Sequence, residues 1–390
     1  MNTFNTYFKR HFLSSWAKVV IYSVIGAVFM TQSINSKYIS YLATIKTDPN
    51  YLITNSMVDI LIIFVAVIAL ITPILEFYQF NNKNNLDTLF SLPISKSKML
   101  LVHYVNGAIQ IAMAFTATYL IWLFAYVCAD FTELHVGYAY LAYPILLLCA
   151  LCIYTIFSFI FLQANNTVDG CVFIVLHVFL FAITGSLVEY LFRQSVTISD
   201  RYVVIFGKFV LNAQDHAAFF NGLNNFIENF VENLNFISIL SQLQRVLDFA
   251  ISPISSYKEV GATDNKYIEY VYNYTYRGFN IDPVQAWLFA ISIAMAIVSF
   301  VIMIKSFKGR NSSIVGETSE SWFGYKTLGA LYSICGMILW CGDYSISIIW
   351  LILTFLGYTL YRRGVKFKIP DIVVMAVTTV LAILGEGFIF

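Results

Sequence analysis

The sequence predicts an all-α polytopic membrane protein, and three observations support this prediction. Of the 390 residues, 59% are hydrophobic and only 12% are charged. The mean hydropathy is +0.73, which is well above the usage of soluble globular proteins. Apolar runs long enough to cross a bilayer as helices recur along the whole chain. Because the formal net charge is only +1, no overall field attracts nucleic acid, and no nucleic-acid partner is expected.

The amino-terminal half is expected to hold an interfacial helix and five spans. Residues 1–16 interleave aromatic side chains with Lys9, Arg10 and His11, a pattern typical of a helix on the inner leaflet; an ordered cap without a function is the alternative. The first apolar run has no small-residue cleavage site after it, so we interpret it as a retained span. Spans one to five fall within residues 17–192, at about 17–32, 57–80, 101–127, 138–162 and 170–192.

The rest of the chain is expected to hold a large outer region and a further group of spans. Residues 193–283 form a polar extracytoplasmic interval in which apolar side chains recur every three to four residues between residues 220 and 247, predicting an amphipathic helix. Its tyrosine-rich tail suits a membrane interface, an alternating strand or a peptide-contacting surface. Residues 284–305 are span six, residues 306–327 a cytoplasmic loop and residues 328–390 a carboxy-terminal block of about three spans. We expect nine spans, or eight if the short first run of this block does not cross.

The cysteines give no sign of a stapled outer domain. The outer interval 193–283 contains none of the six, so a disulfide framework there is not expected. Cys149 and Cys152 form a C-x-x-C, but it lies inside a helix-length apolar run, so neither a redox nor a metal role is expected. All six lie in or beside apolar runs: Cys128, Cys149, Cys152, Cys171, Cys335 and Cys341.

Lysine and arginine are distributed asymmetrically, which predicts the orientation. With the amino terminus in the cytoplasm, the short outer loops carry only Lys37 and Lys46. The inner segments then carry Lys9, Arg10, Lys18, Lys83, Lys96, Lys98, Lys305, Lys308, Arg310, Lys326, Arg362, Arg363, Lys366 and Lys368. Frequent Asn, Ile and Lys are typical of bacterial sequences, so the expected location is the bacterial plasma membrane, with the amino terminus and residues 81–98 in the cytoplasm.

The polar interval between spans two and three predicts a short amphipathic helix. Asn85 can cap it, and Leu86, Leu89 and Phe90 share one face at i, i+3, i+4 spacing. Pro93 ends the helix before the next span begins. This apolar face is expected to meet another protein; the alternative is that it packs under its own spans.

Several kinds of chemistry are missing from the sequence. It contains no G-x-x-x-x-G-K-[ST], no H-E-x-x-H, no G-x-S-x-G and no clustered His/Cys set. The chain is therefore not expected to be an enzyme, to bind ATP or to hold a metal ion. Any ATP-driven function needs a separate ATPase.

Ionisable side chains inside spans are candidates for function because burying them is costly. Asp59, Glu76, Glu189 and Glu386 all lie near span ends, where we expect contact with water. His177 lies deeper, and is expected either to hydrogen-bond a neighbouring helix or to contact a proton or substrate. No carboxylate lies at a comparable depth, which weakens the case for a proton-coupled secondary transporter.

The segment LDTLFSLPISKSKML resembles the cytoplasmic loop between spans two and three in permease subunits of bacterial type-2 ABC exporters. Members carry Leu-Pro-hydrophobic-Ser followed by basic residues, and here these are Leu92, Pro93, Ile94, Ser95, Lys96 and Lys98. The resemblance covers residues 1 to about 310. The basic segment IKSFKGRNSS and the block containing YRRGVKFK are similar to those of the larger Gram-positive peptide and drug exporters. The implied fold is a six-span core, about three carboxy-terminal spans and an extracytoplasmic insertion between spans five and six.

The resemblance also implies a function and its partners. The loop would be a coupling helix that docks in a cleft of a cytoplasmic ATPase, which binds ATP and magnesium. A second permease would complete a homodimer or heterodimer that moves a cargo outward. The long, aromatic outer region suits an amphipathic cargo, a peptide or a drug; lipid-linked molecules stay open. The alternatives are a membrane sensor or scaffold with a ligand-binding outer region, and a secondary transporter.

The expected functional residues fall into two sets. The ATPase-coupling set comprises Leu86, Asp87, Leu89, Phe90, Leu92, Pro93, Ile94, Ser95 and Lys96. The expected substrate path includes His177, Glu189, Phe226 and Phe230.

Overall fold

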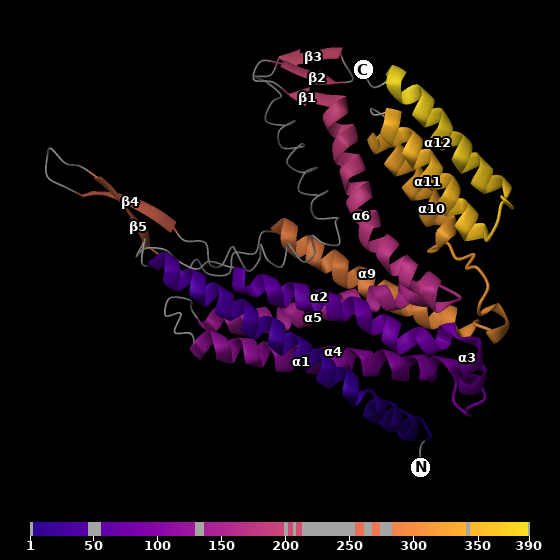
Figure 1. Ribbon diagram of the computed structural model, residues 1–390, viewed down its shortest axis with the longest axis horizontal. Coiled ribbons are helices and arrows are strands. Elements are labelled where there is room, and N and C mark those ends of the chain that lie inside the picture. The colour runs from indigo at the N-terminus through magenta and orange to yellow at the C-terminus, as the bar shows by residue number, and fades with distance from the viewer. Residues whose placement is uncertain are drawn as a thin grey trace. The chain divides into compact units, whose positions relative to one another are not determined.

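Helices occupy the apolar runs of the chain in the computed structural model (Figure 1). The structure describes residues 3–45, 56–128, 136–198, 202–205, 208–212, 254–260, 267–273, 283–340 and 344–388. The helices are α1 (Thr3–Ile45), α2 (Ser56–Phe77), η1 (Tyr78–Asn81), α3 (Lys83–Phe90), α4 (Lys96–Cys128), α5 (Val136–Leu162), α6 (Thr167–Ser195), α9 (Pro283–Lys308), η2 (Ser312–Ile314), α10 (Tyr325–Trp340), α11 (Tyr344–Arg362) and α12 (Ile369–Phe388). The predominantly helical, polytopic fold class is therefore confirmed.

Each predicted span coincides with one of these helices, although not all are equally suited to crossing a bilayer. Within the described residues, six stretches are long and apolar enough: Phe4–Gln32, Leu61–Asn81, Lys96–Phe124, Tyr143–Leu162, Ala290–Lys308 and Ser345–Arg362. Shorter apolar stretches lie in α6 and α12, and α10 has only 16 residues. The short run that made the predicted number of spans uncertain is α10.

The polar interval between α6 and α9 contains strands. β1 (Val196–Ile198), β2 (Tyr202–Ile205) and β3 (Lys208–Asn212) form one antiparallel sheet, and β4 (Ile254–Val260) pairs with β5 (Tyr267–Asn273) in another. In the second sheet Tyr270 lies opposite Tyr257. Of the three interpretations of the tyrosine-rich tail, the structure therefore supports the strand over β5, and the predicted amphipathic helix between residues 220 and 247 lies outside the described residues.

The amino-terminal helix differs from expectation. Residues 1–16 were predicted as a separate interfacial helix, whereas α1 continues unbroken through this stretch to Ile45. No residue from Thr3 to Ile25 is a proline or glycine, so nothing there ends the helix. Ser15 is also only 2% exposed, while Trp16 on another face is exposed. The first turns of α1 therefore already pack against the chain on one face.

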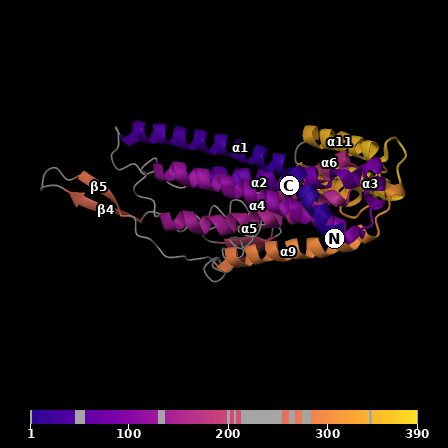
Figure 2. The same ribbon diagram turned by 90° about the horizontal axis from the view of Figure 1, so that it is seen from below.

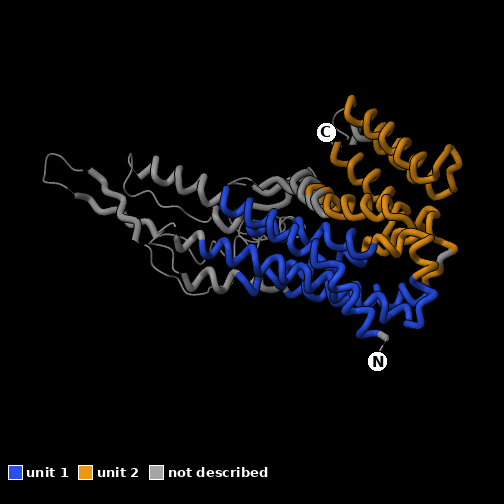
Figure 3. Tube along the Cα trace, turned by 60° about the horizontal axis from the view of Figure 1, so that its bottom comes forward, with its two compact units in different colours: residues 1–77, 89–159, 240–309 blue, residues 78–88, 160–239, 310–390 orange. Residues whose placement is uncertain are grey.

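The chain forms two compact units (Figure 3). The first comprises residues 1–77, 89–159 and 240–309, and the second residues 78–88, 160–239 and 310–390. In the first unit α1, α2 and α9 each pack along α4, and these helices run lengthwise beside one another (Figure 2). In the second unit α10 packs against α6, α11 and α12.

Gly107 of α4 makes room for a buried tyrosine of α5 in the first unit. Tyr154 of α5 is fully buried, and its hydroxyl donates to the carbonyl of Tyr104 in α4 over 3.1 Å. A Cβ atom at Gly107 would lie 2.2 Å from this hydroxyl. A larger residue at position 107 would therefore displace the Tyr154 side chain, which lies between α4 and α5.

Candidate functional site

Residues 78–98, here called the α2–α4 segment, contain η1, α3, a turn and the start of α4. The backbone N–H of Asn84 donates to the side-chain oxygen of Asn82 over 3.1 Å, and the N–H of Leu86 donates to the Asn82 carbonyl over 2.9 Å. Asn82 is thus the capping residue of α3. The predicted cap at Asn85 is wrong, because the helix already begins at Lys83.

The apolar face of α3 packs within the chain. Leu86 is fully buried, and Leu89 and Phe90 are half-buried. The Phe90 ring lies 6.4 Å from the Phe307 ring in an edge-to-face arrangement, and the Lys96 ammonium lies 4.6 Å from the centre of the Phe90 ring. This agrees with the alternative interpretation, in which these side chains hold the segment to its own helices.

The opposite side of the α2–α4 segment faces outward. Asp87, Pro93 and Ser95 are exposed, and Leu92 is 37% exposed. Ile94 is half-buried. The turn is ordered by a hydrogen bond of 2.7 Å from the Ile94 N–H to the Leu92 carbonyl. These residues, rather than the apolar face of α3, form the surface that a partner can reach.

Asn81 and Arg310 anchor the α2–α4 segment in the second unit. Asn81 is the last residue of η1 and is 4% exposed. Its side-chain oxygen accepts a hydrogen bond of 2.5 Å from the Arg310 guanidinium. Its side-chain nitrogen donates to the carbonyls of Phe161 and Asn166 over 3.5 and 3.4 Å. The segment is thereby fixed to the turn between α5 and α6.

Arg310 also closes the carboxyl end of α5. The guanidinium donates to the carbonyls of Leu162 and Ala164 over 2.6 and 2.8 Å. The Leu162 carbonyl has no partner inside the helix because the last turn of any α-helix leaves its carbonyls unpaired, and Ala164 follows the end of the helix. Burial lowers the pKa of Arg310 to about 10, so the side chain stays protonated at neutral pH and can hold all these acceptors.

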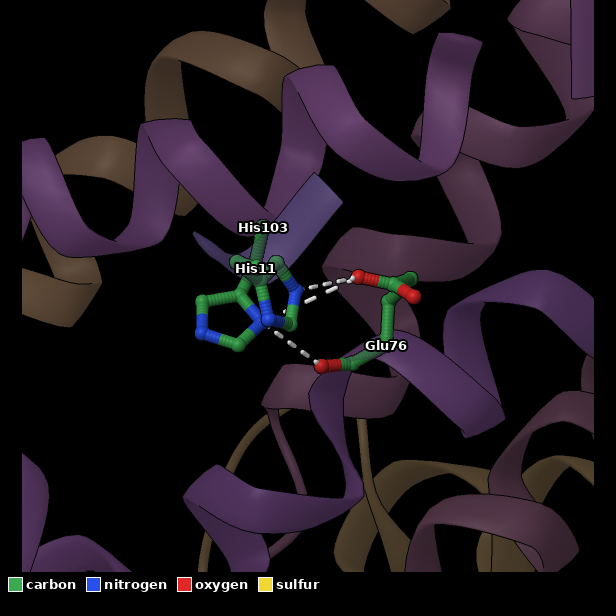
Figure 4. Close-up of side chains that lie close together, drawn as sticks. All are labelled: His11, Glu76 and His103. Carbon is green, nitrogen blue, oxygen red and sulfur yellow. Dashed lines mark hydrogen bonds and ion pairs between the residues drawn. The ribbon is translucent and has the colours of Figure 1, made fainter. Parts of the chain in front are cut away.

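A buried carboxylate anchors the α2–α4 segment in the first unit. Glu76, in the last turn of α2, is 1% exposed (Figure 4). It is surrounded by donors from α1 and α4, at distances of 2.6 Å from Lys18, 3.0 Å from His11, 3.2 Å from Asn106 and 2.8 Å from Gln110. We call these five residues, together with His103, the Glu76 cluster. The expected contact of Glu76 with water is wrong, because α1 and α4 close over it.

His103 completes the Glu76 cluster through contacts of both ring nitrogens. Its Nδ1 lies 3.1 Å from the backbone carbonyl of Glu76, which can only accept, so Nδ1 carries the proton. Its Nε2 lies 3.0 Å from the Tyr7 hydroxyl and shares a hydrogen bond with it. The Glu76 carbonyl belongs to the last turn of α2 and needs such an outside donor. His103 therefore joins α4 to both α1 and the end of α2.

Two polar stripes make the cluster possible. On α4, His103, Asn106 and Gln110 follow i, i+3, i+7 spacing, which places them on one helix face. On α1, His11 and Lys18 are seven residues apart and share a face in the same way. Sequence reasoning missed both stripes, although a polar stripe within an apolar helix was the signal that could have found them.

Three members of the cluster offer atoms that could hold a metal ion. Ligand atoms of His11, Glu76 and His103 lie within 4.8 Å of one another. However, the Lys18 ammonium already pairs with the Glu76 carboxylate at 2.6 Å, and both His103 nitrogens have hydrogen-bond partners. A divalent cation would lie beside this ammonium. It would also replace the hydrogen bonds that His11 and His103 make through their ligating nitrogens. The geometry therefore favours a buried, hydrogen-bonded ion pair over a metal centre.

Of the residues predicted for a substrate path, the structure describes the side chain of His177 alone. His177 is buried, and its Nδ1 lies 2.8 Å from the Phe173 carbonyl of its own helix, not of a neighbouring one. Glu189 lies in α6, but its side chain is not described. Phe226 and Phe230 lie outside the described residues.

Residues 49–212 match the model of a family described as ABC-2 family transporter protein. No curated protein matches this chain, and no solved structure does. The matched range includes the whole α2–α4 segment and Glu76, the two features that the geometry singles out. Together with the multiple apolar helices, the match supports an ABC-2 type permease, the membrane-embedded part of an ABC transporter.

Proposed function

We propose that this chain is the permease of an ATP-driven exporter in the bacterial plasma membrane. Its amino terminus faces the cytoplasm, and its energy comes from separate ATPase subunits that bind ATP and magnesium. The observation that carries the proposal is the α2–α4 segment: an exposed edge from Asp87 to Ser95, held by the buried polar anchors Glu76 and Asn81.

This arrangement suits the transmission of a mechanical load. A partner that presses on Leu92 and Pro93 pushes on a segment that is fixed at its amino-terminal end by Glu76 and Asn81. The force therefore passes into the helices and is not absorbed by bending of a loose loop. At Glu76 the force reaches α1 and α4 through the ion pair and the amide contacts. At Asn81 it reaches the end of α5 through Arg310.

The proposed cargo is an amphipathic molecule, a peptide or a drug, moved outward by two permeases acting as a homodimer or heterodimer. Support for such a cargo comes from the tyrosine-rich sequence of β5, which includes Tyr267, Tyr270 and Tyr272. The membrane setting supports it further, since an amphipathic cargo concentrates at the bilayer surface.

Stimulated ATP hydrolysis tests the proposal. The permease is purified with the ATPase encoded beside it, reconstituted, and assayed with Leu92 replaced by aspartate. Leu92 is the best probe because Leu89 and Phe90 are half-buried in their own chain, so a charge there also perturbs folding. We expect Leu92→Asp to abolish permease-dependent ATP hydrolysis and the matched control Leu92→Met to retain it.

Two results would overturn this assignment. If no ATPase binds the chain while the outer region still binds peptide, the protein is a sensor or scaffold. If proteoliposomes transport cargo without ATP, it is a secondary transporter.

A further inference from the structure

The second unit contains a cavity of about 400 Å³ between α6, α10 and α11. Its size lies within the range of about 300–1,000 Å³ that is usual for small-molecule sites. The walls are mainly apolar and aromatic, with Leu176, Trp350 and Tyr358 among them. Asp169 and Arg363 provide the only charges in the lining. The cavity is therefore shaped for an apolar molecule that carries a polar group at one end.

Two glycines on facing helices leave this space open. A Cβ atom at Gly357 of α11 would meet nothing within 4 Å, and one at Gly329 of α10 would meet only the Tyr358 ring at 3.6 Å. By contrast, a Cβ atom at Gly336 would lie 2.0 Å from Trp350, where the helices do touch. Glycine in a helix interior is less stable than alanine by about 0.5–1 kcal/mol. No close helix contact requires a glycine at position 329 or 357, so the loss of helix stability there is not offset by closer packing.

The cavity borders an apolar surface of α11. Leu353 and Leu360 line the cavity and are 51% and 78% exposed. The same helix exposes further large apolar side chains, Ile348, Ile349, Ile352, Phe355 and Leu356. Because α11 is one of the candidate spans, this surface faces acyl chains when the helix is in the bilayer. A lipid can therefore enter the cavity sideways.

The polar end of the cavity has an unusual backbone. Arg363 follows α11 with a φ of 52°, and Gly364 has a φ of 151°. The N–H groups of Arg363 and Gly364 donate to the carbonyls of Leu360 and Thr359 over 3.1 and 3.0 Å, which forms a Schellman cap. Glycine is the usual residue at the position of Arg363. An arginine there costs about 1 kcal/mol of backbone strain, and its cap hydrogen bonds come from the backbone alone.

The guanidinium of Arg363 is also available for a ligand. Arg362 is paired with Asp371 at 2.7 Å, and Lys368 with Glu320 at 2.5 Å. Arg363 has no carboxylate partner among the described residues, and its guanidinium makes one long contact of 3.3 Å with the Gly316 carbonyl. Asp169, the other charge, already accepts hydrogen bonds from Tyr325 and Asn166 over 2.9 and 2.6 Å.

We propose that this cavity binds one membrane phospholipid, with an acyl chain between α10 and α11 and the phosphate on the Arg363 guanidinium. Basic pockets between membrane helices bind anionic headgroups in this way. A lipid is favoured over an exported cargo because the cavity borders a lipid-facing helix surface. The carboxy-terminal helices α10 and α11 also lie outside the matched range 49–212. The inference is independent of the proposed transport activity.

Native mass spectrometry of the full chain tests this proposal. The chain is delipidated, titrated with phosphatidylglycerol or phosphatidylcholine, and compared with three variants. Arg363→Gly removes the phosphate contact and relieves the strained cap. Gly357→Leu fills the cavity. Lys366→Gln, an exposed cation outside the lining, is the matched control for surface charge.

We expect one retained phosphatidylglycerol in the parent and in Lys366→Gln. Arg363→Gly should bind it about fivefold more weakly, since one basic group near the surface contributes about 1 kcal/mol. Gly357→Leu should bind none. Both variants should melt at or above the temperature of the parent, which separates lost binding from lost folding. Unchanged retention in Arg363→Gly and Gly357→Leu, or an equal loss in Lys366→Gln, would overturn the site. Binding of a peptide cargo in this cavity in place of a lipid would also overturn the site.

Discussion

Replacing Glu76 by glutamine removes the charge at the centre of the Glu76 cluster while keeping the shape of the side chain. The Lys18 ammonium, 2.6 Å away, then loses its counter-charge. An amide N–H₂ group also replaces one acceptor oxygen and meets donors on every side. Removing one partner of a buried ion pair costs about 3–5 kcal/mol. Because the Lys18 side chain is 29% exposed, water can solvate the ammonium in part, so we expect a loss below that range, about 2–3 kcal/mol.

The free energy of unfolding can be measured by titrating the detergent-solubilised chain with a denaturing detergent. Lys18→Met is measured alone and in combination with Glu76→Gln, which completes a double-mutant cycle. We expect the double variant to be more stable than the sum of the single losses predicts, with a coupling energy of at least about 1 kcal/mol. A coupling energy below about 0.5 kcal/mol would refute the buried pair.

Two further predictions concern how the α2–α4 segment is held. Asn82→Ala should reduce stability by about 1 kcal/mol because it removes the cap of α3, whereas Asn85→Ala should stay within about 0.5 kcal/mol; equal effects on chemical denaturation would argue against the cap. Arg310→Met should cost at least about 2 kcal/mol, since it leaves several buried acceptors unpaired, while Lys308→Met on the exposed side should be nearly neutral. Proteolysis at the α5–α6 turn, faster only in Arg310→Met, would report the loosened anchor, and equal cleavage in the two variants would contradict it.

The positions of the helices could be predicted from the sequence because apolar runs of spanning length leave the backbone few other options in a bilayer. The turn between α5 and α6 was predicted for the same reason. Residues 163–169 are the polar break between two such runs, and Asn166 caps α6 by accepting from the Asp169 N–H over 2.7 Å. Here the capping residue and the alternation of apolar runs with a polar break indicate the same turn.

The Glu76 cluster could not be predicted in the same way. Glu76 was expected at a water interface because it lies near the end of its span. The sequence gives only the position of a residue along its own helix, and exposure to water was inferred from that position. Its burial depends on α1 continuing straight past Trp16 and laying His11 and Lys18 over the end of α2. That is a tertiary property, since the packing partner is some sixty residues away in the sequence.

The side of the α2–α4 segment that meets a partner was harder to predict, for a similar reason. The resemblance placed Asp87, Leu92, Pro93 and Ser95 in the coupling set, whereas the spacing alone drew attention to the apolar face of α3. An apolar face at i, i+3, i+4 spacing shows that a helix has something to bury, but not whether the partner is its own chain. Leu86 is buried within the chain, and Phe90 lies against Phe307 of α9, far away in the sequence. The side left for a partner is the polar edge with Leu92 and Pro93, where composition gives a weak signal.

Site-specific photo-crosslinking tests the central claim most directly, that an ATPase docks on the exposed edge of the α2–α4 segment. A photoreactive amino acid is placed at Leu92, which is partly exposed, and separately at Leu86, which is fully buried, in chains reconstituted with the ATPase. The account predicts a crosslink to the ATPase from position 92 that changes in yield when ATP is added, and none from position 86. An ATPase that binds the chain but does not crosslink at position 92, or crosslinks equally from both positions, would contradict it.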